Sequence, residues 1–130
     1  QVPTRDVEKY GIISGKEITP GNFEIFDVVE KPAAAKAPST WALPGRYVFD
    51  AKIFAFLEQA KPGKNGEIQL TDSMTLLAKD RGLLGLSFTA KRYDAGDKLG
   101  YLIANVELAL AHQEIGPDFK DYLKKLAETL

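Results

Sequence analysis

The adjacent charges Glu30-Lys31, followed at once by Pro32, form the strongest candidate for chemistry in the sequence. They end a run of β-branched and aromatic residues, 23–29, that is typical of a strand. Ligands of open α/β sheets bind at the carboxyl ends of strands, so this pair is well placed for binding. A carboxylate accepts hydrogen bonds from sugar hydroxyls, and a lysine holds phosphate as a point charge. A solvated strand end before a proline turn is the alternative interpretation.

Carboxylates near predicted helix starts form a second group of candidates. Asp94 lies between a predicted strand and a predicted helix. It could bind Mg²⁺, which usually takes one or two carboxylates together with substrate phosphates. The alternative is an ordinary helix start, with Asp94 or Asp97 as the cap. Glu67 and Asp72 also open a predicted helix, where the positive end of the helix dipole accounts for them.

The composition argues against several kinds of chemistry. The 130 residues include no cysteine, which excludes disulfides, thiol catalysis and thiolate zinc sites and is typical of a cytoplasmic protein. The single histidine, His112, lies near a predicted helix end that suits a cation without any catalytic role. Neither a Walker-type loop nor Gly-x-Gly-x-x-Gly occurs. A net charge of −1 gives no case for nucleic acid or an anionic membrane as a partner, and no apolar run approaches the ~18 residues of a spanning helix.

The elements that position these residues follow from hydrophobic periodicity and turn residues. Turns are expected at 14–15 and 19–22, and strands at 23–29, 41–49 and 83–89. In the last strand Leu84, Leu86 and Phe88 share the expected buried face. Helices are expected from 50 to about 60, over 67–79, from about 98 until Gly116-Pro117, and after 118. This mixture indicates an α/β fold. So few strands make a thin sheet, and its exposed edges favour pairing with further strands. The sequence also lacks an initiator Met. Both observations suggest that the sequence is part of a longer protein.

Five segments together resemble one known family. They are 9–13 (KYGII), 29–32 (VEKP), 45–48 (GRYV), 66–72 (GEIQLTD) and 93–101 (YDAGDKLGY). In this order and spacing the sequence resembles the C-terminal part of bacterial UTP–glucose-1-phosphate uridylyltransferases, also called UDP-glucose pyrophosphorylases. Glu-Lys-Pro alone is shared across sugar nucleotidyltransferases, whereas the fourth and fifth segments point to the uridylyl-transferring branch.

The resemblance implies a Rossmann-like nucleotidyltransferase fold with a mixed sheet flanked by helices. It implies an Mg²⁺-dependent exchange in which glucose-1-phosphate attacks the α-phosphorus of UTP to give UDP-glucose and pyrophosphate. The family's Gly-rich nucleotide loop and first metal aspartate lie in an N-terminal half that is absent from this sequence. The 130 residues alone are therefore expected not to catalyse the full reaction.

The resemblance also implies roles for individual residues. Gly11 would let the backbone approach the sugar, and Glu30 would bind glucose hydroxyls. Lys31, the implied catalytic residue, would contact the sugar phosphate. Gly45 resembles a position lining the sugar pocket, and Asp94 resembles a second metal carboxylate.

The chain is divided into two parts by predicted function. Residues 1–115 would bind the sugar phosphate, and residues 116–130 would form a C-terminal helix available for a subunit contact in a homo-oligomer. Two alternatives stay open: another sugar-1-phosphate nucleotidyltransferase, and a non-catalytic binding or dimerisation module.

Overall fold

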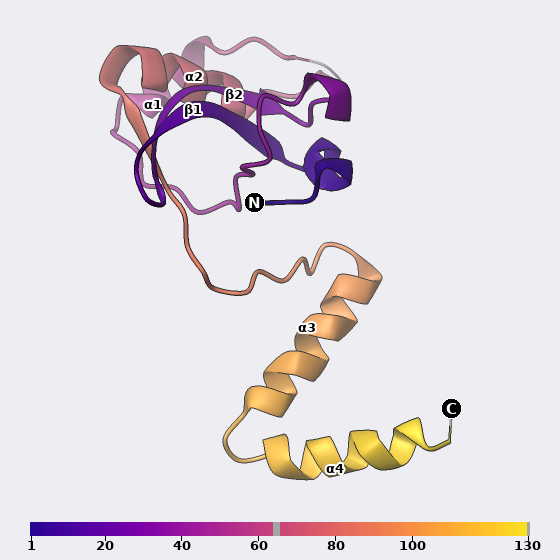
Figure 1. Ribbon diagram of the computed structural model, residues 1–130. Helices are drawn as coiled ribbons and strands as arrows, with labels where there is room; N and C mark the ends of the chain where they lie inside the picture. Colours follow the sequence, from indigo (N-terminus) through magenta and orange to yellow (C-terminus); the bar gives the residue numbers. More distant parts are fainter. Residues whose placement is uncertain (64–65, 130) are drawn as a thin grey trace. The chain divides into compact units, whose positions relative to one another are not determined.

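The computed structural model describes residues 1–63 and 66–129, and these form two compact units, Gln1–Thr89 and Ala90–Leu130 (Figure 1). Within its described residues the first unit contains these elements in chain order: η1 (Thr4–Lys9), a 3₁₀ helix; β1 (Gly11–Thr19); β2 (Asn22–Glu30); η2 (Ala34–Lys36), a 3₁₀ helix; α1 (Ile53–Gln59); α2 (Leu70–Arg81); and β3 (Leu83–Leu86). The second holds α3 (Lys98–Ala111) and α4 (Gly116–Ala127). The α/β class is thus confirmed. The predicted functional division at residue 115 stays a prediction, and the boundary between the compact units lies elsewhere.

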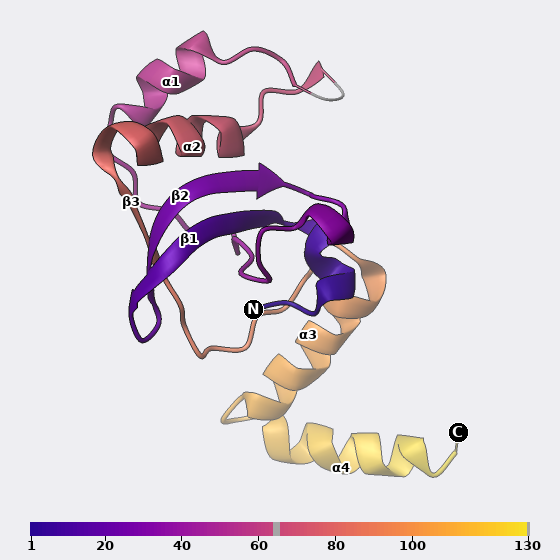
Figure 2. The same cartoon turned by 45° about the horizontal axis from the view of Figure 1, so that its top comes forward.

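The sheet has the order β1-β2-β3, and both pairs of neighbours are antiparallel. A mixed sheet also needs parallel pairs, which the described residues do not contain. α2 packs against β2, and Figure 2 shows α1 and α2 together on one side of the hairpin formed by β1 and β2. The buried core side chains are Ile13, Phe23, Ile25, Val28 and Met74.

A bulge in the hairpin decides which face of β2 carries the charged strand end. Ser14 pairs with Asp27 and Gly15 with Ile25, so Phe26 is skipped. The extra residue shifts the side-chain alternation, which explains why Ile25 and Val28 are both buried although they are three residues apart. The turn expected at 14–15 is wrong, because β1 continues through these residues. A Cβ at Gly15 would collide with the carbonyl of Glu24, so the glycine permits close approach of the strands.

The strand expected at 41–49 is also wrong. Only Ala42 forms a bridge, to Ile12, flanked by hydrogen bonds from Ile13 N to Trp41 O (3.0 Å) and from Leu43 N to Gly11 O (2.9 Å). Residues 41–43 thereby pair with the first part of the outer edge of β1, at residues 11–13. Pro44 then removes a ladder donor, and Gly45 turns the chain at φ +90°, so residues 46–49 leave the sheet.

The third strand is real but presents the opposite face. Gly85 packs closely on Ile25, since an added Cβ would lie 3.1 Å from the Ile25 Cδ1 atom, and Leu83 packs against the core. Leu84 and Leu86 are 74% and 75% exposed, and Phe88 is also exposed. The expected buried face is therefore wrong, because Leu83 and Gly85, and not Leu84 and Leu86, lie on the face of the sheet that carries the core.

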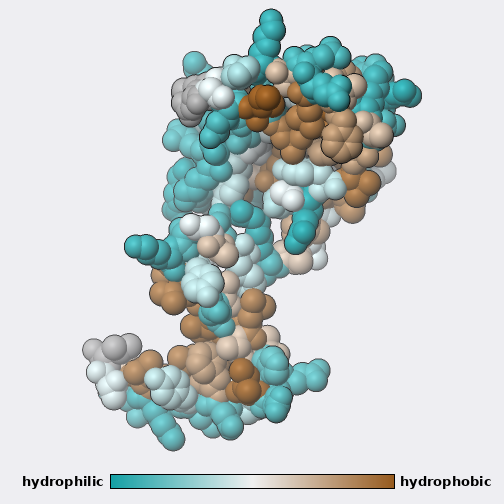
Figure 3. All heavy atoms as spheres, turned by 180° about the vertical axis from the view of Figure 1, so that it is seen from behind, coloured by the Kyte–Doolittle hydropathy of each residue, from teal (hydrophilic) through white to brown (hydrophobic). Residues whose placement is uncertain are grey.

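In the second unit α3 and α4 pack against each other. Asp97 caps α3, where its Oδ1 accepts a hydrogen bond from Gly100 N (2.9 Å). Gly116-Pro117, expected to separate the helices, instead forms the first turn of α4, where proline is tolerated because its N–H is not needed. Figure 3 shows hydrophobic residues on the surface of each unit.

Candidate sugar-phosphate site

Pairing of the first two strands brings three predicted site residues together. Gly11 opens β1 and pairs with Glu30, which ends β2. The backbone continues this pairing by one step, because Lys31 N donates to Tyr10 O at 3.0 Å. Antiparallel register therefore places a glycine, a carboxylate and a lysine at one end of the hairpin.

A cavity of about 220 Å³ lies at this end of the hairpin. It is lined by Lys9, Tyr10, Gly11, Glu30, Leu43, Pro44, Gly45, Tyr47 and Thr71. The structure thus collects Gly11, Glu30 and Gly45 around one space from three separate segments. Lys31 is adjacent to Glu30 but is not among the lining residues.

The two glycines serve the cavity in different ways. A Cβ at Gly11 would lie 3.2 Å from both the Glu30 Oε2 atom and the Thr71 Cγ2 atom, so this position keeps the backbone accessible beside the carboxylate. Gly45 has open space around an added Cβ, and its φ of +90° is the reason for glycine there. One glycine is required by close packing and the other by the backbone turn.

Lys31 has an unusual backbone conformation. Its φ is +44°, and it is the single non-glycine residue with positive φ among those described. Its Nζ lies 3.9 Å from the Glu30 Oε1 atom, and the side chains of Lys31 and Glu30 are 63% and 29% exposed. Such a distance and exposure make a weak ion pair, which leaves both groups able to contact a ligand.

Sequence reasoning missed the polar residues that complete the lining. Burial, and then the negative charge of Glu30, raises the pKa of Tyr47, while a backbone hydrogen bond at Gly45 opposes the shift. Thr71 is 6% exposed, and its hydroxyl has no hydrogen-bond partner among the described residues. Tyr47 lies in the GRYV segment and Thr71 in GEIQLTD, so the family resemblance of these two segments was the available signal.

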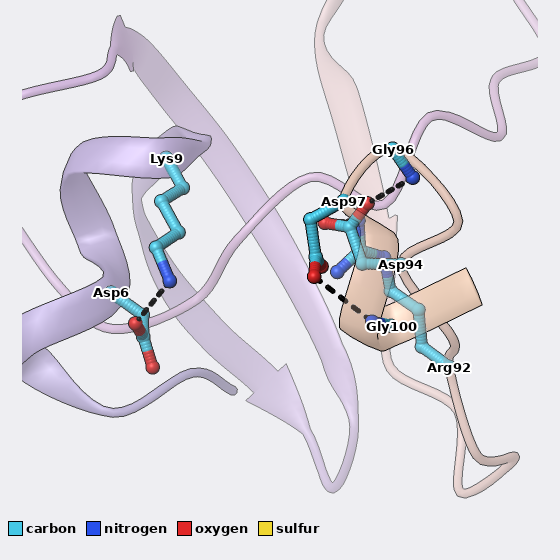
Figure 4. Close-up of polar contacts among 7 residues, drawn as sticks. All are labelled: Asp6, Lys9, Arg92, Asp94, Gly96, Asp97 and Gly100. Atoms are coloured by element: carbon cyan, nitrogen blue, oxygen red, sulfur yellow. Dashed lines mark hydrogen bonds and ion pairs between the residues drawn. The ribbon is translucent and has the colours of Figure 1, made fainter. Parts of the chain in front are cut away.

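Lys9 brings an ammonium group into the lining. Its Nζ lies 2.8 Å from Asp6 Oδ1 on the same 3₁₀ helix (Figure 4). The hydrogen bond from Lys9 is the main cause of the lowered pKa of Asp6. Asp6 thus holds this lysine as a charged pair.

Asp94 belongs to the second unit and is held by its own loop. Its Oδ1 accepts a hydrogen bond from Gly96 N (3.0 Å), and Arg92 Nη2 lies 3.3 Å from its Oδ2 (Figure 4). Asp97, rather than Asp94, caps α3. Among residues 1–63 and 66–129, no group of three His, Cys, Asp or Glu side chains could hold a metal ion. Asp94 fits as one Mg²⁺ ligand, since each carboxylate oxygen has two lone pairs, but the described residues do not complete a metal site.

The sequence profile of nucleotidyl transferases matches residues 1–110. The chain belongs to the nucleotidyl transferase family. A UTP–glucose-1-phosphate uridylyltransferase of Streptococcus pyogenes serotype M1 is 39% identical over all of this chain and 43% of its own length. A Methanocaldococcus jannaschii protein provisionally given the same name is 44% identical over all of this chain and 45% of its own.

Solved structures of this family show the same architecture. A UDP-glucose pyrophosphorylase complexed with UDP-glucose is 39% identical and superposes with a TM-score of 0.77 over 96% of this chain and 42% of its own. A UTP-bound enzyme from Acinetobacter baumannii is 34% identical, with a TM-score of 0.81 over 96% of this chain and 43% of its own. The chain therefore spans less than half the length of these relatives.

No helix in the described part of the chain is long and apolar enough to cross a membrane. The cytoplasmic location expected from the composition stays a prediction.

Proposed function

We propose that this chain supplies the sugar-1-phosphate side of a UTP–glucose-1-phosphate uridylyltransferase. The observation that carries the proposal is the cavity in which Gly11, Glu30 and Gly45 meet, with Lys31 directly beside Glu30. The names of the relatives support the choice of UTP and glucose-1-phosphate as substrates, and UDP-glucose and pyrophosphate as products.

The reaction is a transfer of a nucleotidyl group. A phosphate oxygen of glucose-1-phosphate forms a bond to the α-phosphorus of UTP, and the bond from that phosphorus to the bridging oxygen breaks as pyrophosphate leaves. Positioning and charge neutralisation carry such a reaction. In this proposal Glu30 accepts hydrogen bonds from glucose hydroxyls, Lys31 binds the sugar phosphate, and the two glycines keep the backbone open to the sugar.

Asp94 is proposed as one ligand of Mg²⁺, which would neutralise phosphate charge when bound. Substituting Asp94 by Asn keeps the shape of the side chain but removes its charge. In the natural gene product, Asp94→Asn should raise the Mg²⁺ concentration that gives the half-maximal rate. Asp97→Asn is the matched control, because it changes a capping carboxylate in the same loop. If the Mg²⁺ titration curves of Asp94→Asn and the parent coincide, Asp94 orders its loop and is not a metal ligand.

The UTP-binding residues are proposed to lie outside the 130 residues. Phosphates are usually cradled by backbone N–H groups at a helix start after a Gly-rich loop, and the sequence has no such loop. Calorimetry of the 130-residue chain with UTP and Mg²⁺ should give no specific binding. Specific, Mg²⁺-dependent binding would contradict this part of the proposal.

The sugar-phosphate assignment is tested by binding of glucose-1-phosphate to the 130-residue chain. Lys31→Ala should weaken the affinity at least about 10-fold, corresponding to ~1.4 kcal/mol. Lys36→Ala is the matched control, since Lys36 is an exposed lysine outside the cavity lining. Equal affinities of Lys31→Ala and the parent would reject Lys31 as the phosphate contact, and no binding by the parent would reject the assignment of the cavity.

We also propose that the second unit forms a contact between subunits. Its exposed apolar side chains include Leu99, Leu102 and Tyr122, which suit a homo-oligomer interface. Sedimentation velocity of the natural gene product would test this, and a monomer at micromolar concentration would contradict it.

A further inference from the structure

A hydrogen-bonded link joins α2 to β2 on the side of the hairpin where the helices lie (Figure 2). The Thr75 hydroxyl donates to the Asp27 Oδ1 atom at 2.7 Å and accepts from Val28 N at 3.0 Å. Thr75 and Asp27 are both half-buried, and neither lines the cavity at Glu30. The link therefore lies outside the candidate site, and the proposed function alone gives it no role.

The link occupies a position where β2 lacks a neighbouring strand. Val28 pairs with Ile13, and Ile13 N donates to Trp41 O, so the backbone N–H of Val28 points away from β1. On that other side β3, as described, pairs with β2 as far as Ile25. The Thr75 hydroxyl thus accepts a hydrogen bond that a strand would otherwise accept, which satisfies a buried donor.

The link lies close to the cavity along both of the elements that it joins. Thr71, whose 6% exposed side chain lines the cavity, precedes Thr75 by about one helical turn, a rise of about 6 Å. Glu30 follows Asp27 by three strand residues, or about 10 Å. Two walls of the cavity therefore come from elements that are hydrogen-bonded to each other nearby.

Apolar packing alone does not fix the position of α2 along β2. The buried side chains of Met74 and Val28 belong to the same core cluster. Burial of apolar surface is non-directional, however, so it tolerates small shifts of a helix over a sheet. A hydrogen bond requires a definite distance and angle between donor and acceptor. Because the Thr75 hydroxyl bonds to two successive residues of β2, it fixes the helix along the strand.

The cavity leaves little room for a shift of α2. A Cβ added at Gly11 would lie 3.2 Å from both the Thr71 Cγ2 atom and the Glu30 Oε2 atom. The helix and the carboxylate thus approach the same backbone position from two elements. Misplacement of a bound group by about 1 Å can cost roughly 100-fold in rate. The distance between Thr71 and Glu30 therefore affects how well a sugar is held.

We propose that Thr75 and Asp27 are positioning residues for the sugar-phosphate site. Their hydrogen bond holds α2 against β2, so that the Thr71 wall of the cavity stays at the distance at which Gly11 and Glu30 hold the sugar. Neither Thr75 nor Asp27 contacts the substrate. The inference rests on the proposed function, because it takes the cavity at Glu30 as the binding site of glucose-1-phosphate.

Calorimetry of the 130-residue chain with glucose-1-phosphate tests the proposal, at a temperature where circular dichroism shows each variant folded. Thr75→Val removes the hydroxyl but keeps a branched side chain. It should weaken the affinity roughly 10-fold, less than the roughly 100-fold cost of a full 1 Å misplacement. Thr75→Ser keeps the hydroxyl and should bind like the parent. Ser73→Ala is the matched control and should also bind like the parent, because it removes a buried hydroxyl of α2 that does not line the cavity.

A purely structural role of Thr75 predicts a different result. Thr75→Val would then lower the Tm of the chain but leave the affinity of the folded chain unchanged, and this outcome would overturn the proposal. An equal loss of affinity in Ser73→Ala would also overturn it. No binding by the parent would reject the proposed function and the positioning role with it. Equal binding by the parent and Thr75→Val would reject the positioning role alone.

Asp27→Ala breaks the same link from β2 and gives an independent measurement, which also serves if Thr75→Val does not fold. It should weaken the affinity about as much as Thr75→Val does. Because both changes remove one hydrogen bond, their effects should not add, and the double variant should bind within about 2-fold of either single variant. Multiplied losses in the double variant would show that the two residues act separately, contrary to the proposal.

Steady-state kinetics of the natural gene product separate positioning from a general weakening of the enzyme. Thr75→Val should raise the KM for glucose-1-phosphate several-fold. It should leave the KM for UTP unchanged, since the UTP-binding residues are proposed to lie outside the 130 residues. Equal increases in both KM values would contradict the positioning role.

Discussion

Lys31 has a left-handed backbone conformation. From this conformation we predict an effect on stability that does not depend on the proposed contact between Lys31 and the sugar phosphate. A non-glycine residue in this conformation costs roughly 1–2 kcal/mol, because its Cβ crowds the following carbonyl oxygen. Glycine avoids that crowding but loses about 0.4–1 kcal/mol through the greater freedom of the unfolded chain. Replacing Lys31 by Gly should therefore give a protein about 0.5–1 kcal/mol more stable than replacing it by Ala.

The comparison of Gly with Ala isolates the backbone, because both substitutions remove the same ammonium group and the same weak ion pair with Glu30. Urea unfolding is the assay. With a slope of about 1–3 kcal/mol per molar urea for a small protein, the difference should move the midpoint by a few tenths of a molar unit. Both variants should bind glucose-1-phosphate poorly. A difference between their free energies of unfolding therefore does not arise from a difference in ligand binding.

Lys36 provides the control with the opposite sign. It lies in the 3₁₀ helix η2, where the backbone has no need of glycine. Lys36→Gly should be less stable than Lys36→Ala by about 0.5–1 kcal/mol, because glycine in a helix loses more conformational freedom on folding than alanine does. If Lys31→Gly is also less stable than Lys31→Ala, the positive φ at Lys31 carries no strain and the reasoning fails.

The remaining predictions concern packing, capping and charge. Gly11→Ala should cost about 1–3 kcal/mol in urea unfolding and weaken glucose-1-phosphate binding, because the new Cβ would crowd Glu30; unchanged stability and affinity would refute the close approach. Asp97→Ala should cost ~1 kcal/mol through loss of the cap on α3, and equal urea midpoints would contradict this. The pKa of Glu107 is lowered mainly by its hydrogen bond from Lys91, so the unfolded state binds its proton more readily. Thermal stability should therefore fall as pH drops below about 4.5, and Glu107→Gln should flatten that fall; a parent-like profile for Glu107→Gln would be the contrary result.

Local sequence signals were sufficient for the strand that carries the site. The apolar, β-branched run before Glu30 predicted β2, and Pro32 predicted its end. The turn at 19–22 was also predictable from its Pro-Gly pair, which joins β1 to β2. Grouping of Gly11 with Glu30 came from the family resemblance, since sequence alone does not give the register of two strands.

The failures share a physical cause, which is dependence on neighbours that local sequence does not reveal. Alternation in 83–89 shows two faces but not which one lies on the core side of the sheet, and Gly85 lies on that side beside Ile25, where its lack of a side chain allows close packing. Residues 46–49 have strand propensity, but a strand also requires hydrogen-bond partners. Tyr47 and Thr71 reach the cavity only through tertiary packing, so their residue types alone gave no indication of the site.

The boundary between Thr89 and Ala90 has a consequence for how this family can diversify. The residues proposed to recognise the sugar phosphate all precede the boundary, whereas Asp94 follows it. Recombination near residue 90 could therefore exchange the segment with the candidate metal ligand while inheriting the sugar lining unchanged. The sugar lining and the candidate metal ligand Asp94 would then be inherited separately, and chimaeras joined at this position would show which parent sets the sugar preference.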